Sequence, residues 1–131
     1  MVIIDTDILV GFLRGNSEAI EKIKEIENSN TKLFTTSINS YEVYKGAYLS
    51  SNSTKNLFQV MKLLQNITII DFDSDASQIS AKIHVYLKNK GLPIDLMDQM
   101  IASIVISKNE ILITRNKKHY KNIPNLKLEI W

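Results

Sequence analysis

The sequence contains no cysteine among its 131 residues, so disulfide bonds and thiolate metal sites are excluded. It also lacks any apolar run that approaches the ~20 residues of a membrane-spanning helix. The N-terminus has neither the basic flank nor the small-residue cleavage site of a signal peptide. No glycine-rich phosphate loop and no Ser/His/Asp arrangement is present. We therefore expect a cytoplasmic protein that does not associate with a membrane.

Composition and charge are those of an ordinary globular protein. Hydrophobic residues make up 44% of the chain and charged residues 23%. The length suits one hydrophobic core, so we expect residues 1–131 to form a single domain. The formal net charge of +2 is too small to indicate nucleic-acid binding by itself, but basic residues crowd the last quarter of the chain. These are Lys108, Arg115, Lys117, Lys118, Lys121 and Lys127.

Short β-branched runs alternate with helical patterns along the chain. This alternation predicts parallel strand–helix–strand units, and hence an α/β fold with a mostly parallel sheet. The expected strands are residues 2–4, 32–36, 67–71, 111–114 and 127–130. The expected helices cover residues 8–14 and 17–28, a stretch capped by Ser37 that carries Tyr41, Tyr44 and Tyr48, then about 57–64, 76–90 with Gly91 as C-cap, and 95–108.

The first strand ends in Asp5, at a position where α/β proteins often bind ligands. Val2, Ile3 and Ile4 are typical of a strand buried on both faces. Open α/β sheets bind ligands outside the carboxyl ends of such strands. The alternative is that Asp5 or Thr6 only caps the next helix.

Three further acids qualify as candidate site residues. Glu42 lies near the apolar face of the tyrosine helix, where a bare carboxylate must be paired, protonated or bound to a cation unless it reaches solvent. Asp95 and Asp98 lie three residues apart at the start of the last long helix, and therefore share one face. They either cap that helix or converge with Asp5 on a divalent metal.

The fourth strand ends in the polar triplet Thr114, Arg115 and Asn116. In a parallel sheet this triplet lies at the same edge as Asp5. Asn116 is either a cap of the short segment that follows or a neutral member of the acidic cluster. We interpret His84 and His119 as isolated surface residues rather than metal ligands.

Several motifs, taken in order, resemble the PIN-domain family and, within it, the VapC-type toxins of toxin–antitoxin pairs. The resemblance covers nearly the whole chain. It implies a PIN-like three-layer fold, with a central sheet of four to five strands flanked by helices. The motifs are Ile4-Asp5-Thr6-Asp7-Ile8-Leu9-Val10, Leu13-Arg14-Gly15, Ser37-Ile38-Asn39-Ser40-Tyr41-Glu42-Val43, Gly91-Leu92-Pro93-Ile94, Asp98-Gln99-Met100-Ile101-Ala102 and Ile113-Thr114-Arg115-Asn116 with the residues up to Leu128.

The resemblance also implies an activity, which is RNA cleavage by an acidic cluster that binds Mg2+ or Mn2+. Carried over by position, the three acids are Asp5, Glu42 and Asp98. The fourth polar position falls on Asn116, where many relatives have aspartate, so one charge fewer is available for a second metal. Asp95 lies one turn from Asp98 and could supply that charge, which is our inference and not a family property.

Each residue type suits this chemistry. Hard divalent cations prefer oxygen ligands, and we expect Asp5 and Asp98 to bind the metal directly while Glu42 acts through water or orients the nucleophile. The resemblance further implies a small antitoxin protein as partner and a homodimer. Residues expected to hold the carboxylates or contact the RNA are Thr6, Thr114, Asn116, Arg14 and Arg115.

Other functions remain open at this point. Asp5-Thr6-Asp7 after a strand is also typical of haloacid-dehalogenase-like phosphatases, although that class has a late acidic pair where this chain has Arg115 and Asn116. A receiver domain phosphorylated at Asp71 is disfavoured by the long helical stretch from Ser37 to Gln65. A PIN-fold binding module with weak or no activity would also account for Asn116.

Overall fold

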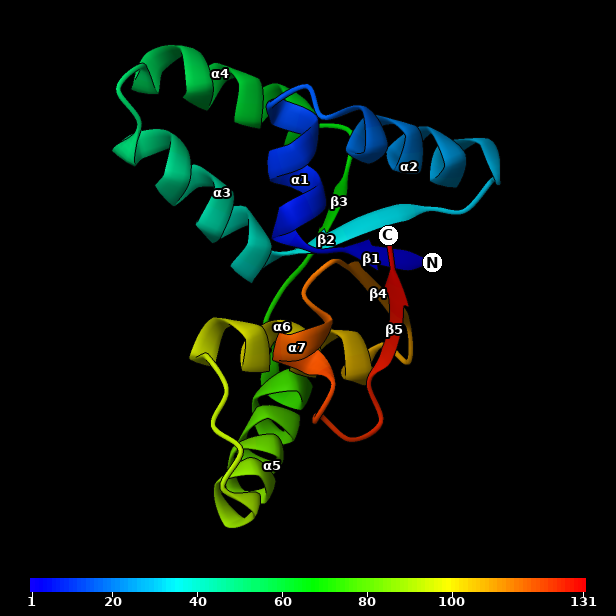
Figure 1. The fold of residues 1–131 in the computed structure, drawn as a ribbon, viewed down its shortest axis with the longest axis vertical. Coiled ribbons are helices and arrows are strands. Elements are labelled where there is room, and N and C mark those ends of the chain that lie inside the picture. Colours follow the sequence, from blue (N-terminus) through cyan, green and yellow to red (C-terminus); the bar gives the residue numbers. More distant parts are fainter.

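A five-stranded parallel sheet forms the centre of the computed structural model, which describes residues 1–131 (Figure 1). Its strands lie in the order β3-β2-β1-β4-β5, and each neighbouring pair is parallel. The chain therefore winds outward from β1 in one direction and then returns to add β4 on the other side. The strands are β1 (Val2–Ile4), β2 (Leu33–Thr36), β3 (Thr68–Ile70), β4 (Ile111–Thr114) and β5 (Lys127–Ile130).

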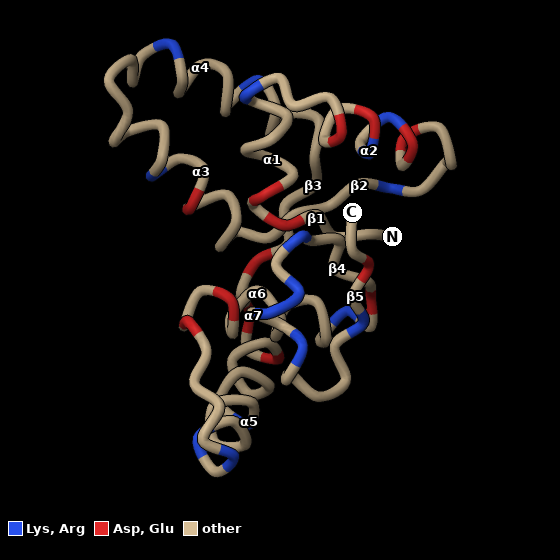
Figure 2. Tube along the Cα trace, viewed as in Figure 1, with Lys and Arg blue, Asp and Glu red and all other residues tan.

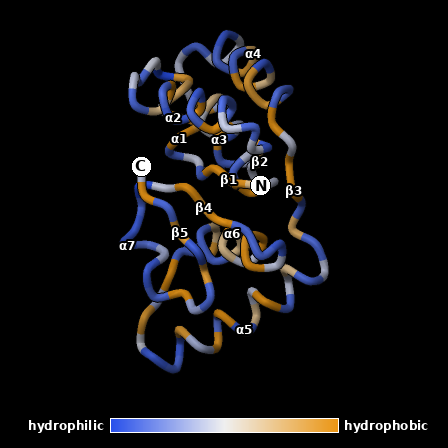
Figure 3. The backbone as a smooth tube through the Cα atoms, turned by 90° about the vertical axis from the view of Figure 1, so that its right-hand side faces the viewer, coloured by the Kyte–Doolittle hydropathy of each residue, from blue (hydrophilic) through white to orange (hydrophobic).

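Seven helices cover the two faces of the sheet and complete a three-layer α/β fold. Helices α1 to α4 lie on one side and α5 to α7 on the other, as two views at right angles show (Figures 1 and 3). None of the helices combines the length and the apolar character that a membrane span requires. The helices are α1 (Thr6–Leu13), α2 (Ser17–Asn28), α3 (Ser37–Leu49), α4 (Ser53–Leu64), α5 (Ser74–Lys90), α6 (Leu96–Ser107) and α7 (Lys117–Tyr120).

The sheet separates two hydrophobic clusters, because successive strand residues point to opposite faces. Ile4 and Ile113 join the cluster formed with α1 to α4. Ile3 and Leu112 join the cluster formed with α5 to α7. The hydropathy colouring in Figure 3 shows hydrophobic segments along the strands and again along the helices on both sides. β1 and β4 are thus buried on both faces, as their unbroken apolar sequences predict.

Several element boundaries differ from the expected ones, each for a local reason. Helix α3 is capped by Thr36 and not by Ser37: the Thr36 hydroxyl accepts from the Asn39 N–H at 3.1 Å, and Asn39 Oδ1 accepts from the Thr36 N–H at 3.3 Å. This reciprocal capping box makes Ser37 the first helical residue. Gly91 ends α5 in the left-handed conformation at φ 67°, as expected for a C-cap glycine.

The tyrosines of α3 are less buried than their helical spacing predicts. Tyr41 is 49% exposed and Tyr48 is 68% exposed, so neither belongs to the core. Tyr44 alone packs against the hydrophobic cluster of that side. The helix lies at the edge of the molecule, and its core contacts are made by Val43 and Ala47 instead.

Candidate active site

Asp5 lies at the carboxyl end of the central strand and caps helix α1. The order of the strands reverses between β1 and β4, and ligands bind outside the strand ends at such a switch point. Asp5 is only 3% exposed. Its Oδ1 accepts from the Thr6 N–H and from Asn39 Nδ2, both at 2.9 Å, and its Oδ2 accepts from the Thr114 hydroxyl at 2.7 Å. The helix cap and the candidate site residue are therefore one and the same carboxylate.

Burial raises the pKa of Asp5 to about 6. The hydrogen bonds from Thr114 and Thr6 oppose this rise, while the nearby charge of Asp7 adds to it. Hydrogen-bond donors on α1, α3 and β4 thus hold the carboxylate in place. They offset only part of the free-energy cost of burying its negative charge. Such a group favours a cation beside it.

Glu42 joins Asp5 through a network of hydrogen bonds between α1 and α3. The Thr6 hydroxyl donates to Glu42 Oε1 at 2.8 Å and accepts from Asn39 Nδ2 at 2.9 Å. Burial raises the pKa of Glu42, the Thr6 hydrogen bond lowers it, and the charge of Asp98 raises it further. Glu42 is therefore neither a solvated surface glutamate nor part of a salt bridge.

Asp98 approaches the same site from the first turn of α6. Its Oδ2 lies 3.0 Å from Nδ1 of His119, and its Oδ1 accepts from the Tyr120 hydroxyl at 3.3 Å. Burial raises the pKa of Asp98, and His119 opposes the rise. The buried Tyr120 hydroxyl also lowers the pKa of Asp5. Tyr120 therefore lies between the two acids, and burial together with their charges raises its own pKa.

Asp5, Glu42 and Asp98 lie near one another, because the charge of Asp98 raises the pKa of Glu42 and the charges of Asp5 and Asp98 raise that of Tyr120. In Figure 2 the red segments of α1, α3 and α6 lie toward the centre of the molecule, with the blue segments of α7 alongside. The oxygen atoms that these residues offer to a metal ion belong to carboxylate, hydroxyl and amide groups. Such ligands suit Mg2+ or Mn2+ and not a soft metal. No three acidic or histidine side chains converge closely enough to hold an ion by themselves. An ion held here would therefore have to take part of its coordination from water, as Mg2+ commonly does.

The remaining predicted site residues lie around this centre. Asp95 caps α6, with its Oδ1 accepting from the Met97 N–H at 2.9 Å, and it is exposed. Asn116 occupies the N-cap position of α7, but its side chain makes no capping hydrogen bond. Its backbone N–H donates to the Thr114 hydroxyl at 3.0 Å. Arg14 is exposed at the end of α1 and lines a groove that Glu42 also borders.

Asp7 and Arg115 form a second, structural network beside the site. Asp7 Oδ2 accepts from the Arg115 N–H at 2.7 Å, and its Oδ1 accepts from the Trp131 indole N–H at 3.1 Å. The Arg115 guanidinium lies 3.6 Å from the centre of the Trp131 ring and pairs with Glu18. Asp7 thus links α1 to the residues that follow β4 and β5.

Sequence reasoning missed three residues of the site. Asn39 lies three positions before Glu42 on the same helical face, and this spacing is a signal that could have identified it. His119 is exposed, as predicted, but it is not isolated, because it contacts Asp98. Tyr120 follows directly, and nothing in the sequence indicates that its hydroxyl reaches Asp98 from α7.

A model of the PIN domain family matches residues 2–124 of the chain. The chain belongs to the PIN domain family. This PIN domain is 31% identical over 128 residues to ribonuclease VapC2 of Rickettsia felis, covering 98% of this chain and 96% of the relative. It is also 31% identical over 112 residues to the tRNA(fMet)-specific endonuclease VapC of Salmonella typhimurium, covering 85% of each chain.

Solved structures of similar chains share the whole fold. A chain of VapBC2 from Rickettsia felis, bound to a DNA fragment from the promoter, superposes with a TM-score of 0.92 at 29% identity, covering 100% of this PIN domain and 99% of that chain. A chain of DNA-bound VapBC from Salmonella typhimurium gives a TM-score of 0.90 at 26% identity, covering 99% and 97%. The three-layer fold expected from the sequence is thus confirmed.

Proposed function

We propose that this PIN domain is a metal-dependent endoribonuclease and the toxin of a VapBC-type toxin–antitoxin pair. The observation that carries the proposal is the buried Asp5 at the switch point of the sheet, joined through Thr6 to Glu42 and through Tyr120 to Asp98. The ribonuclease names of the similar proteins support the choice of RNA over other phosphodiesters.

The proposed cofactor is Mg2+, with Mn2+ as a substitute, near Asp5 and Asp98. When bound, such an ion neutralises charge on the phosphodiester and lowers the pKa of a coordinated water. Asn39, Thr6 and Thr114 hold the Asp5 carboxylate in one orientation through the hydrogen bonds described above. These hydrogen bonds keep the Asp5 carboxylate in a fixed orientation. None of the three residues transfers a proton in the proposed reaction.

Glu42 is the proposed acceptor of the proton from the attacking water. Only its Oε1 is engaged, by the Thr6 hydroxyl, and burial raises its pKa toward the range that suits a general base near neutral pH. In the proposed hydrolysis, water adds to phosphorus, its proton passes to Glu42, the bond to the 3′ oxygen breaks, and the 3′ oxygen takes up a proton from solvent water. The products carry 5′-phosphate and 3′-hydroxyl ends, as the family resemblance implies.

The proposed partners follow from the same likeness. The similar solved chains come from VapBC complexes, so we propose a small antitoxin protein as partner. We also propose a homodimer, a cytoplasmic location where RNA is available, and a single folding unit over residues 1–131. Arg14 and Lys117 are proposed contacts of the RNA backbone, which would make binding sensitive to salt.

The phosphatase alternative has less support in the geometry. Its second aspartate must be free to act as an acid, whereas Asp7 accepts hydrogen bonds from Thr114, the Arg115 N–H and Trp131. The PIN-fold binding module without activity shares the whole fold and is an outcome of the experiment below.

RNA cleavage by the full chain, purified without a partner, tests the proposal. We expect cleavage of structured RNA that requires Mg2+ or Mn2+, and its loss in Asp5→Asn. Glu42→Gln should lower kcat by about 10²–10⁴-fold, the usual contribution of a general base. Asp71→Asn changes an exposed acid on the far side of β2 and should leave kcat unchanged.

The outcomes are distinct. Cleavage by Asp5→Asn at the wild-type rate would overturn the proposed site, and cleavage in the presence of a chelator would overturn the metal. If the wild-type chain binds RNA but cleaves none with either metal, the binding-module alternative is correct instead.

A further inference from the structure

A pocket next to Asp98 is not used by the proposed chemistry. It lies between the end of α5, the turn of residues 91–95 that leads into α6, and α7 with the two residues Asn122 and Ile123. Its volume is about 170 Å³. The Asp98 carboxylate forms part of its wall, so any group bound in the pocket lies directly beside the candidate active site.

The size of the pocket limits what it can hold. Pockets that enclose drug-sized ligands commonly have volumes of ~300–1,000 Å³, and this one is smaller. It therefore suits a single ring system, not a stretch of peptide or oligonucleotide. Because it opens beside the site of the proposed reaction, the ring would belong to the same molecule as the reacting phosphate.

The walls offer what the faces of a nucleobase require. Leu87, Leu92 and Ile123 supply apolar surface. The His119 imidazole lines the pocket and is oriented by its contact with Asp98 at 3.0 Å. Proteins that bind unpaired RNA hold bases by stacking them on aromatic rings, histidine included, and against apolar side chains.

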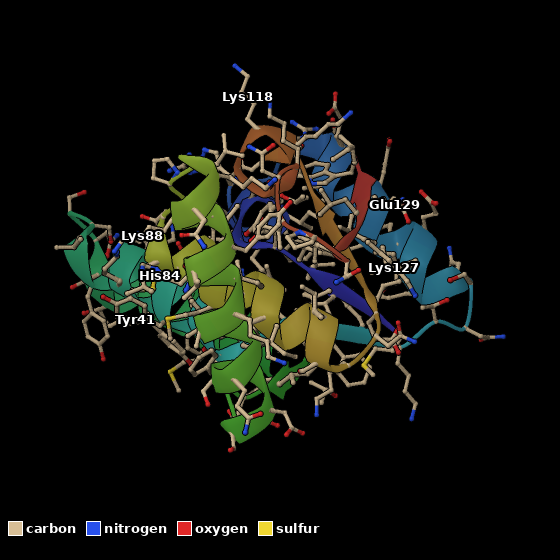
Figure 4. The ribbon with its side chains drawn as sticks, turned by 90° about the horizontal axis from the view of Figure 1, so that it is seen from below. Tyr41, His84, Lys88, Lys118, Lys127 and Glu129 are labelled. Atoms are coloured by element: carbon tan, nitrogen blue, oxygen red, sulfur yellow. The ribbon has the colours of Figure 1, made fainter.

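The rim offers groups for the edge of a base. Asp95 uses only Oδ1 to cap α6, so its Oδ2 is available as an acceptor. The Asn122 amide and the Lys118 ammonium make no hydrogen bond within the chain, and Lys118 extends outward from α7 (Figure 4). The rim therefore combines a carboxylate acceptor, an ammonium donor and an amide that serves as both.

We propose that this pocket binds the nucleobase of the nucleotide next to the scissile phosphate and that it prefers guanine. Guanine presents O6 as an acceptor beside two donor groups, N1–H and N2–H, which match the Lys118 ammonium, the free Asp95 Oδ2 and the Asn122 amide oxygen. Uracil has a single N–H for the carboxylate, and adenine places a ring acceptor against it. The inference rests on the proposed nuclease function, and it gives Asp95 a role in base selection rather than in metal binding.

The test uses the full chain and a short RNA whose cleavage position has been mapped. Each nucleotide that flanks the cleaved bond is replaced in turn by an abasic one, and kcat/KM is measured. One replacement should lower kcat/KM by about tenfold, since it removes the stacked base. Replacing the same nucleotide by uridine should lower kcat/KM for the wild-type chain, and Asp95→Asn should reduce this discrimination.

A variant that fills the pocket makes the assignment specific. Leu92→Trp places a large ring in the pocket from an exposed position, so the fold is retained. It should lower kcat/KM on intact RNA by about tenfold and abolish the additional loss caused by the abasic nucleotide. The control is Asn89→Ala, which changes an exposed residue near the end of α5, outside the pocket. It should leave unchanged both kcat/KM on intact RNA and the loss of kcat/KM caused by the abasic nucleotide.

Binding of mononucleotides provides a readout that does not depend on cleavage. Guanosine monophosphate, added without metal, should shift the NMR signals of His119 and Asn122 at lower concentration than uridine monophosphate does. If RNA is cleaved and Asp5→Asn is inactive, but no abasic replacement matters or Leu92→Trp leaves its effect intact, the pocket assignment is overturned and the nuclease assignment stands. If the wild-type chain cleaves no RNA, the nuclease assignment is overturned, and the pocket assignment is overturned with it only if guanosine monophosphate also fails to shift these signals at lower concentration than uridine monophosphate does.

Discussion

At the scale of the residue, Asp5 combines two roles that sequence reasoning treated as alternatives. It caps α1 through the Thr6 N–H, and it also lies at the end of the central strand with Asn39 and Thr114 as donors. A carboxylate with 3% exposure is costly to bury as an anion. The hydrogen bonds from Thr6, Asn39 and Thr114 offset part of that cost.

The raised pKa of Asp5 predicts how stability depends on pH. In the native state the pKa of Asp5 is about 6, against 3.8 for an aspartate exposed to water. As the pH rises, Asp5 therefore loses its proton at a higher pH in the native state than in the unfolded chain. For this reason the free energy of unfolding falls as the pH rises from about 4 to about 6, and it stays low above that. Asp5→Asn cannot ionise, and without metal it should be more stable than wild type by roughly 1–3 kcal/mol at pH 8.

This substitution fits the hydrogen-bond network. The new amide can donate to the Thr114 oxygen, whose own hydroxyl can turn toward Asp7 at 3.1 Å. Urea unfolding at pH 4 and pH 8 is the measurement, with Asp71→Asn as the exposed control. An advantage of Asp5→Asn that is equal at both pH values would contradict the buried anion as its cause.

At the scale of the element, the short helix α1 is placed by its close contact with α2. A Cβ atom added at Gly11 would lie 2.8 Å from the Ala19 Cβ and 3.6 Å from the Trp131 ring. The glycine therefore allows α2 to approach α1, and this approach helps to fix the helix that begins at Asp5. Gly46 in α3 has no atom within 4 Å of the corresponding position.

The two helical glycines predict opposite effects of the same change. Gly11→Ala should lower the free energy of unfolding by about 1–3 kcal/mol, because the added methyl group forces the helices apart. Gly46→Ala should raise it by about 0.5–1 kcal/mol, because alanine restricts the unfolded chain and meets no neighbour. Thermal and urea unfolding of the two variants give the comparison. A Gly11→Ala variant that is as stable as wild type or more stable would mean that α1 and α2 can separate without cost, and a destabilised Gly46→Ala variant would contradict the open space beside Gly46.

At the scale of the whole molecule, the sheet divides the interior into two hydrophobic clusters that share the same strands. Ile3 and Ile4 are neighbours in β1 and belong to different clusters. Loss of packing on one side therefore disturbs the strand that supports the other. This arrangement favours one cooperative folding unit, in line with the single domain proposed above.

Matched leucine substitutions on the two sides test this cooperativity. Leu9 and Leu112 are both fully buried, and they lie in different clusters. We expect Leu9→Ala and Leu112→Ala each to cost about 2–5 kcal/mol, with one urea transition that is the same by circular dichroism and by the fluorescence of Trp131. Two separate transitions, or a shift seen by only one probe, would show instead that the two layers unfold independently.

The sequence by itself predicted the five strands and the six longer helices, and it identified Asp5, Glu42 and Asp98 as candidate site residues. The apolar runs at Val2–Ile4 and Ile111–Thr114 form strands because their burial on both faces is encoded locally. Asp5, Glu42 and Asp98 were named from motif order, and the structure places all three around one centre, where their roles remain proposals. The sequence could not fix the cap of α3 at Thr36, since Thr36 and Ser37 are chemically alike as caps.

Thr6 and Thr114 hold Asp5 as the sequence predicts, but only the tertiary structure decided the other side chains that contact these acids and Asp7. Asn39 reaches Asp5 across 34 residues, His119 reaches Asp98 across 21, and Trp131 reaches Asp7 across 124. Periodicity and capping depend on neighbours along the chain, whereas these contacts depend on how α3, α7 and β5 pack around the ends of β1 and β4. The strand order is what brings those ends together, and that order is a property of the folded chain as a whole.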